Sequence, residues 1–252
     1  MPSLAGMLDV GLIASEPVLR RAINANLRLG LPDNAKRLAK FAIRETSPES
    51  MRVEAIRSLA SWVNPSKLDR VEGRFRDLGS RPVEQIYDIF DQHIGNLLSS
   101  KSDAVREATA EAISRLNYGN AAERLNRLAN DNSLSAKLRA SAVEALYAID
   151  ADEVDSVVAK AIKAKSPLLR AAAVRVLAKR NAKSEELFSA LTEALNGRDI
   201  REQQNAIDVL GSLKSKEAIA LLEIQTQQLI QGATSSFLQL DILEAAKACL
   251  LY

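Results

Sequence analysis

The sequence predicts an all-α protein, an α-solenoid of about seven stacked helix pairs. Three observations support this prediction: a helix-favouring composition, a pattern that returns at nearly constant spacing, and helical periodicity within each copy. Ten glycines, seven prolines and 4% aromatic residues in 252 residues are few, while 47% hydrophobic residues can supply a sizeable core. We expect a single solenoid domain over residues 1–252, with an insertion at about 63–82.

The repeated pattern is an apolar residue, arginine, two variable residues and a small residue, followed four positions later by another apolar residue. It is clear in MRVEAIRSL, VREATAEAI, LRASAVEAL and LRAAAVRVL, fainter in LRRAINANL, and has Gln203 in the arginine position of EQQNAIDVL. The copies end at Leu27, Leu59, Ile113, Leu146, Leu177 and Leu210, which are spaced by 32, 54, 33, 31 and 33 residues. The long spacing is one period plus an insertion after Leu59.

Each copy is predicted to be a helix. In LRASAVEALYAI, the residues Leu138, Ala142, Leu146 and Ile149 recur at helical spacing and share one face. Typical starting residues precede several copies, including Ser102, Ser133, and Ser166 before Pro167. Further helices are expected between them, at roughly 33–45, 84–98, 119–130, 151–164, 183–196 and 215–231. Short links make neighbouring helices antiparallel, so the unit is a helix pair of about 32 residues.

The second helix of this unit resembles that of the short HEAT repeats first noted in phycobilisome lyases. The tetratricopeptide signature W-x2-LG-x2-Y and the ankyrin signature T-P-L-H are missing from the sequence. The resemblance covers most of residues 16–213, and the final pair at 215–251 departs from it. It implies the fold strongly and the function weakly, because HEAT arrays serve many functions.

Residues 23–78 also resemble the HEAT segment of large bacterial membrane-bound dehydrogenase-like proteins. Those proteins join a β-propeller to HEAT repeats and often to a cytochrome-c-like domain. The similar residues are Asn24, Asn26, Arg28, Leu29, Gly30, Asn34, Ala35, Trp62, Pro65, Asp69, Arg70 and Val71. The sequence contains neither a propeller repeat nor a C-x-x-C-H haem motif. The resemblance therefore implies a helical part of a larger protein, without the chemistry.

Charge is nearly balanced overall but uneven along the chain. The formal net charge is +2, yet residues 1–82 hold 14 basic and 9 acidic residues. A single cysteine, Cys249, excludes an internal disulfide. No apolar run is long enough for a membrane span, and the N-terminus lacks signal-peptide features. We expect a cytoplasmic location for the chain as it stands, or a periplasmic one if it derives from an exported multidomain protein.

The sequence offers little for catalysis. One histidine and one cysteine far apart make a zinc site improbable, and the nucleophile-elbow and P-loop motifs are missing. His93 is interpreted as a partly exposed helical residue, with a catalytic base as the alternative. We expect a non-enzyme with no cofactor and no metal.

Two arginine groups are the candidate partner-binding residues. The first is the arginine ladder, the recurring arginine of the repeat, namely Arg20, Arg52, Arg106, Arg139 and Arg170. Each could pair with a carboxylate or carbonyl of the adjacent repeat, or the ladder could line a groove for an anionic surface. A cation near a helix N-terminus needs a local partner, which favours the first interpretation.

The second group lies in the insertion and comprises Arg70, Arg74 and Arg76. Insertions in solenoids emerge on one edge and are frequent contact sites. The alternative is a short helix that covers the edge of the core, with Phe75 packed inward. Trp62, just before the insertion, is expected in the core rather than in a ligand site.

The leading functional hypothesis is a scaffold that holds a protein partner or a sister domain. An alternative is nucleic-acid binding through the basic 1–82 region, as in HEAT-like DNA glycosylases, with Trp62 and Tyr87 as walls of the groove. A third is a lyase-like role on a tetrapyrrole, for which the sequence offers no distinct ligand set. The oligomeric state is left open.

Overall fold

The computed structural model describes residues 1–10 and 15–250 and shows an all-α helical-repeat fold. It divides into two compact units, unit 1 from Met1 to Ala151 and unit 2 from Asp152 to Tyr252, and each is considered by itself. The α-solenoid predicted from the repeat is confirmed, and a single domain over 1–252 stays a prediction. Part of the N-terminal stretch without signal-peptide features, residues 11–14, lies outside the described residues, as do residues 251–252 at the apolar C-terminal end.

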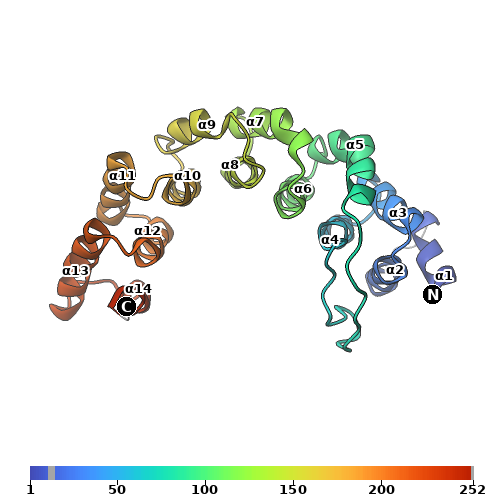
Figure 1. Ribbon diagram of the computed structural model, residues 1–252, viewed down its shortest axis with the longest axis horizontal. Coiled ribbons are helices and arrows are strands. Elements are labelled where there is room, and N and C mark those ends of the chain that lie inside the picture. Colours follow the sequence, from blue (N-terminus) through green and yellow to red (C-terminus); the bar gives the residue numbers. More distant parts are fainter. Residues whose placement is uncertain (11–14, 251–252) are drawn as a thin grey trace. The chain divides into compact units, whose positions relative to one another are not determined.

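Unit 1 is a stack of helix pairs (Figure 1). Helices α2, α4, α6 and α8 contact one another in sequence as one layer, and α3 contacts α5 in the other layer. The bounds are α1 Pro2–Gly6, η1 Met7–Asp9, α2 Glu16–Leu29, α3 Pro32–Ile43, α4 Glu49–Ala60, α5 Glu84–Leu98, α6 Asp103–Leu116, η2 Gly119–Ala121, α7 Ala122–Asn130 and α8 Ala136–Ala148.

Unit 2 continues the same alternation. Helices α10, α12 and α14 contact one another in sequence, and each packs against the helix that precedes it. The bounds are α9 Val154–Ala161, α10 Pro167–Arg180, α11 Glu185–Asn196, α12 Ile200–Leu213, α13 Lys216–Ile230 and α14 Gln239–Leu250. The pair α13–α14, which departs from the repeat pattern in sequence, still occupies the place of a repeat.

The small residue of the pattern lets the second helices approach closely. This position holds Ala55, Thr109, Ala142, Ala173 and Ala206, all with 0% exposure. A larger side chain at any of these positions would force neighbouring helices apart in a core that is already close-packed.

The last apolar residue of each copy fills the core between repeats. Leu59, Ile113, Leu146 and Leu210 have no exposed surface, and Leu27 is buried as well. Leu177 is the exception, since it lies partly exposed on α10. Burial of a leucine or isoleucine side chain contributes about 2 kcal/mol, so these positions hold neighbouring pairs together.

Two of the three helix starts named above are correct. Ser102 caps α6 by accepting a hydrogen bond from the Val105 N–H at 3.2 Å, and α10 begins at Pro167 after Ser166. The third is displaced, because α8 begins at Ala136 and is capped by Ser135 rather than by Ser133. Ser133 instead hydrogen-bonds to Asp131 in the preceding turn.

The insertion is a loop, so the expectation of a short helix with Phe75 packed inward is wrong. An isolated antiparallel bridge joins Leu68 to Phe75, and Phe75 is 74% exposed. Gly73 and Gly79 adopt positive φ values of 66° and 65°, which a helix does not permit. The Asp69 carboxylate also accepts the backbone N–H groups of Val71 and Glu72, an Asx-type turn that competes with helix formation.

Candidate functional site

The arginine ladder has intramolecular partners, several of which are carbonyls at the end of the preceding helix. Arg52 donates to the Ala42 carbonyl at 2.7 Å, and Arg139 donates to the Ala129 carbonyl at 3.0 Å. Arg170 donates to the carbonyls of Ala164 and Lys165 after α9. Carbonyls at a helix C-terminus lack a partner within the helix, and cationic side chains are favoured there.

Gln203 occupies the arginine position of the last copy and does the same. Its side-chain amide donates to the carbonyls of Leu195 and Gly197 at the end of α11. In these four copies the recurring residue is therefore a donor to the end of its own first helix, and its charge is not essential for that contact.

Four of the five ladder arginines also pair with carboxylates. Arg170 binds Glu202 on the next repeat through two hydrogen bonds of 2.7 and 2.6 Å. Arg52, which is buried, also contacts Glu45 and Ser100. Arg106 pairs with Asp103 on its own helix, and Arg20 lies 3.9 Å from Glu54. The predicted role of the ladder toward a partner stays a prediction, and these guanidinium groups are already engaged within the protein.

The insertion is fixed to α2 through a buried carboxylate, Asp69. Both oxygens accept hydrogen bonds from the Asn24 amide at 3.1 and 3.0 Å, although Asn24 lies 45 positions earlier in the chain. Burial alone raises the pKa of Asp69, but the hydrogen bonds from Asn24, Glu72 and Val71 hold it below its usual range. Asp69 is therefore ionised at neutral pH and orders the turn that follows it.

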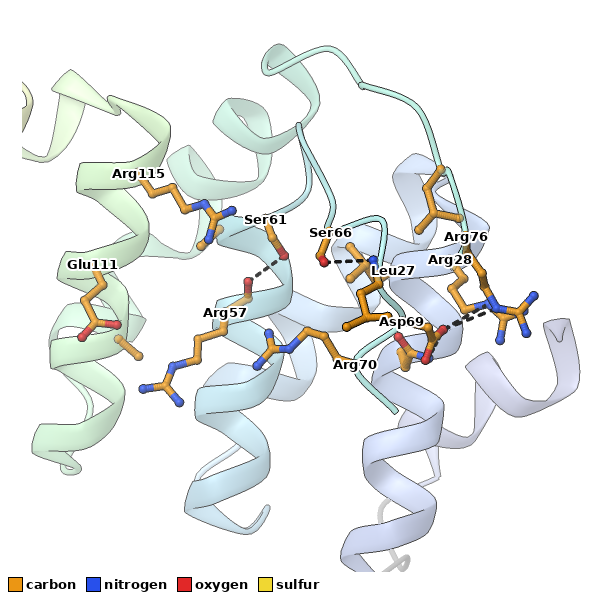
Figure 2. Close-up of a pocket in the computed structure, with 15 residues that line it drawn as sticks. Leu27, Arg28, Arg57, Ser61, Ser66, Asp69, Arg70, Arg76, Glu111 and Arg115 are labelled. Carbon is orange, nitrogen blue, oxygen red and sulfur yellow. Dashed lines mark hydrogen bonds and ion pairs between the residues drawn. The ribbon is translucent and has the colours of Figure 1, made fainter. Parts of the chain in front are cut away.

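Two arginines, one from α2 and one from the insertion, gather around this carboxylate, as Figure 2 shows. Arg28 on α2 lies 3.8 Å from Asp69, and Arg76 from the insertion lies 3.7 Å from it. Both also pair with Glu72. The two carboxylates thus largely neutralise the charges of Arg28 and Arg76. The main role of Arg76 is therefore to fix the insertion in place.

The far end of the insertion is fixed through Arg81. Its guanidinium group lies over the buried Trp62 ring at 4.6 Å from the ring centroid and donates to the Leu27 carbonyl at 2.7 Å. Gly30 makes room for it, because a Cβ there would lie 2.7 Å from that group. Trp62 is fully buried, as expected for a core residue.

Between the insertion and helices α2, α4 and α6 lies a recess of about 460 Å³, here called the basic recess (Figure 2). Its charged lining consists of Arg28, Arg57, Arg70, Arg76 and Arg115 with Asp69 and Glu111. Leu27, Leu68 and Leu78 add apolar surface. All of these residues belong to unit 1, so the recess is complete within one compact unit.

Two of the arginines lie apart from the network around Asp69. Arg57 projects from α4 and Arg115 from α6, and both side chains are exposed (Figure 2). Within residues 1–10 and 15–250, the guanidinium groups of Arg57 and Arg115 make no hydrogen bond or ion pair. Arg70 is intermediate, since it is half-exposed and lies 3.3 Å from Glu54. The recess therefore presents donors that the fold itself does not use.

The tip of the insertion borders the recess with apolar surface. Leu68 lines the recess and is 59% exposed, and the bridge places it opposite the exposed Phe75. Arg74, the third predicted insertion arginine, is exposed next to Phe75 and lies outside the lining. Cationic, apolar and aromatic side chains are thus presented on one fixed loop.

Groups with catalytic potential are dispersed. Among the described residues, no three His, Cys, Asp or Glu side chains are placed to hold a metal ion. His93 is half-buried on α5, where burial and the charge of Lys40 lower its pKa. Burial and the adjacent Asp91 raise the pKa of Tyr118 to about 12. Cys249 is partly buried, with its sulfur 3.6 Å from the Gly211 carbonyl.

The part of the chain that the structure describes has no helix both long and apolar enough to span a membrane.

Sequence reasoning did not single out Arg57 and Arg115. They follow the ladder positions of their helices by five and nine residues, which places them on a different side of the helix from the ladder. The available signal is helical phase for both residues, together with the basic character of residues 1–82 for Arg57. Which arginines stay unpaired depends on neighbouring carboxylates, and those come from other repeats.

Comparison with known proteins supports the repeat assignment. Residues 154–228 match the protein family described as HEAT repeats. A search of curated proteins gives no match.

One of three similar solved structures, with a TM-score above 0.5, shares the fold. The complex of CpcE and CpcF of phycocyanin lyase from Nostoc sp. PCC7120 includes a chain with 18% identity and a TM-score of 0.54, and the match covers 99% of this chain and 95% of that one. An engineered protein has 19% identity and a TM-score of 0.45, with 86% of this chain and 96% of that one covered. Human deoxyhypusine hydroxylase in complex with glycerol has 16% identity and a TM-score of 0.39, with 99% and 85% covered.

Proposed function

We propose that this protein is a non-catalytic interaction scaffold that holds a protein partner or a sister domain, with the basic recess of unit 1 as a contact site. The observation that carries the proposal is the combination of a rigidly fixed insertion with unused donors beside it. Asp69, Asn24 and Arg81 hold the loop in one conformation, while Arg57 and Arg115 stay available. Preorganised surfaces of this kind favour binding because little ordering is required.

The resemblance of residues 23–78 to dehydrogenase-like proteins fits this proposal. Among the similar residues, Asn24, Arg28, Asp69 and Val71 form the network that fixes the insertion. Gly30 and Trp62 surround Arg81. A sister domain docked on the insertion would therefore use a surface that these residues maintain. The phycocyanin lyase chain, which has the same fold, is found in a complex of two proteins.

Nothing favours the nucleic-acid alternative. The two aromatic residues considered as groove walls have other roles: Trp62 is fully buried under Arg81, and the Tyr87 hydroxyl donates to the carbonyls of Leu116 and Asn117. For the tetrapyrrole hypothesis, the structure adds no observation.

Site-specific photo-crosslinking in cells that naturally express the protein tests the proposal. A benzoylphenylalanine residue replaces Arg57 in the recess, or Arg127 on the exposed side of α7 as the control. We expect a discrete protein adduct, or an intramolecular adduct with a sister domain, from position 57 and none from position 127. Equal, diffuse labelling from both positions would contradict the proposal.

A further inference from the structure

Resting on the proposed scaffold function, we infer that the basic recess binds an acidic polypeptide segment in which carboxylate residues lie next to an apolar residue. The inference depends on three features: unused guanidinium groups, an adjacent exposed apolar tip, and a buried carboxylate, Asp69, that the fold already neutralises.

The arginines of the recess divide into two classes. Arg28 and Arg76 are engaged with Asp69 and Glu72, and Arg70 is partly engaged with Glu54. Arg57 and Arg115 have no such contacts within the described residues, and both are exposed on facing helices α4 and α6. A guanidinium group presents donors in a planar fork that matches a carboxylate, so two unused forks fit two carboxylates of one segment.

The acidic side chains of the recess do not cancel these charges. Asp69 is buried and is held by Asn24, Arg28 and Arg76. Glu111 is the exposed carboxylate of the lining, on the same helix as Arg115. Five arginines and two carboxylates line the recess, so it attracts an anionic segment and disfavours a basic one.

The apolar tip indicates a polypeptide. Leu68 at the edge of the recess and Phe75 opposite it are exposed by 59% and 74%. Exposed apolar residues beside charged ones are typical of protein contact sites, where aromatic and arginine side chains carry much of the binding energy. An acidic segment with a leucine-like side chain would neutralise the arginines and cover this tip at once.

The test uses the purified protein and fluorescence anisotropy. The probe is a short fluorescein-labelled peptide in which glutamate and aspartate alternate with leucine. One comparison peptide carries the corresponding amides, a second has serine in place of leucine, and a single-stranded oligothymidylate represents nucleic acid. We expect saturable binding of the acidic leucine peptide at near-physiological salt, and at least about tenfold weaker binding of both comparison peptides.

Matched variants locate the site. Arg57→Glu/Arg115→Glu reverses the two unused charges, and Lys36→Glu/Arg127→Glu makes the same change at exposed positions of α3 and α7. We expect at least about a tenfold loss of affinity for the first and less than about a twofold loss for the second. Arg57→Lys/Arg115→Lys keeps the charge without the fork and is expected to lose affinity by an intermediate factor. Circular dichroism verifies that each variant is folded.

Several results would overturn the inference: equal losses in both charge-reversal variants, no saturable peptide binding, tighter binding of the oligothymidylate, or self-association of the chain that depends on Arg57 and Arg115. A crosslinked partner at position 57 together with no peptide binding would reject the acidic segment and leave the scaffold proposal standing. If neither a crosslinked partner nor peptide binding is found, both the acidic-segment inference and the scaffold proposal are rejected.

Discussion

Several single residues in this protein donate hydrogen bonds to backbone carbonyls at the C-terminal ends of neighbouring helices. The recurring arginine of the repeat donates to carbonyls at the end of the preceding helix in α4, α8 and α10, and Gln203 does so in α12. A buried or half-buried donor placed in this way contributes about 1 kcal/mol, and more when it also binds a carboxylate. The recurrence of this donor at a nearly constant spacing along the chain thus has a structural cause.

Arg170→Ala tests this account. The change leaves the buried Glu202 carboxylate unpaired and removes the donor to Ala164 and Lys165. We expect the free energy of unfolding to fall by about 3 kcal/mol in urea denaturation, and Glu202→Gln in the same chain to restore part of it. Arg180→Ala, which breaks the exposed contact with Asp155, should cost less than about 1 kcal/mol. Similar losses in the free energy of unfolding for Arg170→Ala and Arg180→Ala would contradict this account.

Asp69→Asn addresses the fixation of the insertion. The amide keeps the shape of the side chain but loses its charge, so the contacts with Arg28 and Arg76 weaken and one oxygen no longer faces the Asn24 amide. We expect local opening of the insertion to become easier by about 2 kcal/mol. Faster NMR-detected exchange of the Val71 and Glu72 amide protons would show this. Asp77→Asn, an exposed change in the same loop, should leave those two rates unchanged.

Acid should release the insertion through the same carboxylate. The pKa of Asp69 in the folded protein lies below its value in the unfolded chain. Its contribution is therefore complete above about pH 4 and is lost as the pH falls through the folded-state pKa. Amide exchange of Val71 at decreasing pH, corrected for the intrinsic rate, should accelerate in the wild type and not in Asp69→Asn. Parallel behaviour of the two proteins would contradict this assignment.

At the scale of elements, the helix pairs were predictable and the insertion was not. The period, the small residue and the terminal apolar residue of each copy are local signals, and the structure buries these residues as expected except at Leu177, which is partly exposed. The insertion depends on Asn24 and Asp69, which are 45 positions apart, and on positive φ values at Gly73 and Gly79. Sequence spacing alone does not reveal such a contact, which is why the sequence also allows a short helix in this segment.

Gly30→Ala tests how the end of α2 and the insertion depend on each other. Gly30 has a φ of 70°, and a Cβ there would lie 2.7 Å from the Arg81 guanidinium group. We expect about 1–2 kcal/mol of destabilisation and a changed emission of Trp62, because Arg81 is displaced from its ring. Gly73→Ala is the control. It introduces the same kind of backbone strain, but among the described residues the added Cβ has no atom within 4 Å beyond those of its chain neighbours. An identical change in Trp62 emission for Gly73→Ala would argue against a specific contact.

At the scale of the whole molecule, each helix pair is stabilised by its neighbours within a compact unit. Contacts run between successive second helices in unit 1 and again in unit 2. Stability in such arrays is approximately a sum of nearest-neighbour contributions, so damage in one unit is expected to stay local.

Hydrogen exchange followed by mass spectrometry checks this expectation. Arg170→Ala should accelerate exchange in α10 to α12 of unit 2 while α2 and α4 of unit 1 retain their wild-type protection. Uniform acceleration across both units would instead indicate one cooperative structure. The same experiment with Asp69→Asn should affect residues 66–78 and leave unit 2 unchanged.

The scaffold proposal is most directly tested by quantitative co-purification from cells that naturally express the protein. Tagged wild type, Arg57→Glu/Arg115→Glu and Lys36→Glu/Arg127→Glu are isolated at equal abundance, and the associated proteins are measured by mass spectrometry. We predict a specific partner that is retained by the wild type and by the α3–α7 variant and depleted at least about tenfold by the recess variant. A partner bound equally by all three proteins, or lost equally by both variants, would contradict the assignment of the basic recess as the contact site.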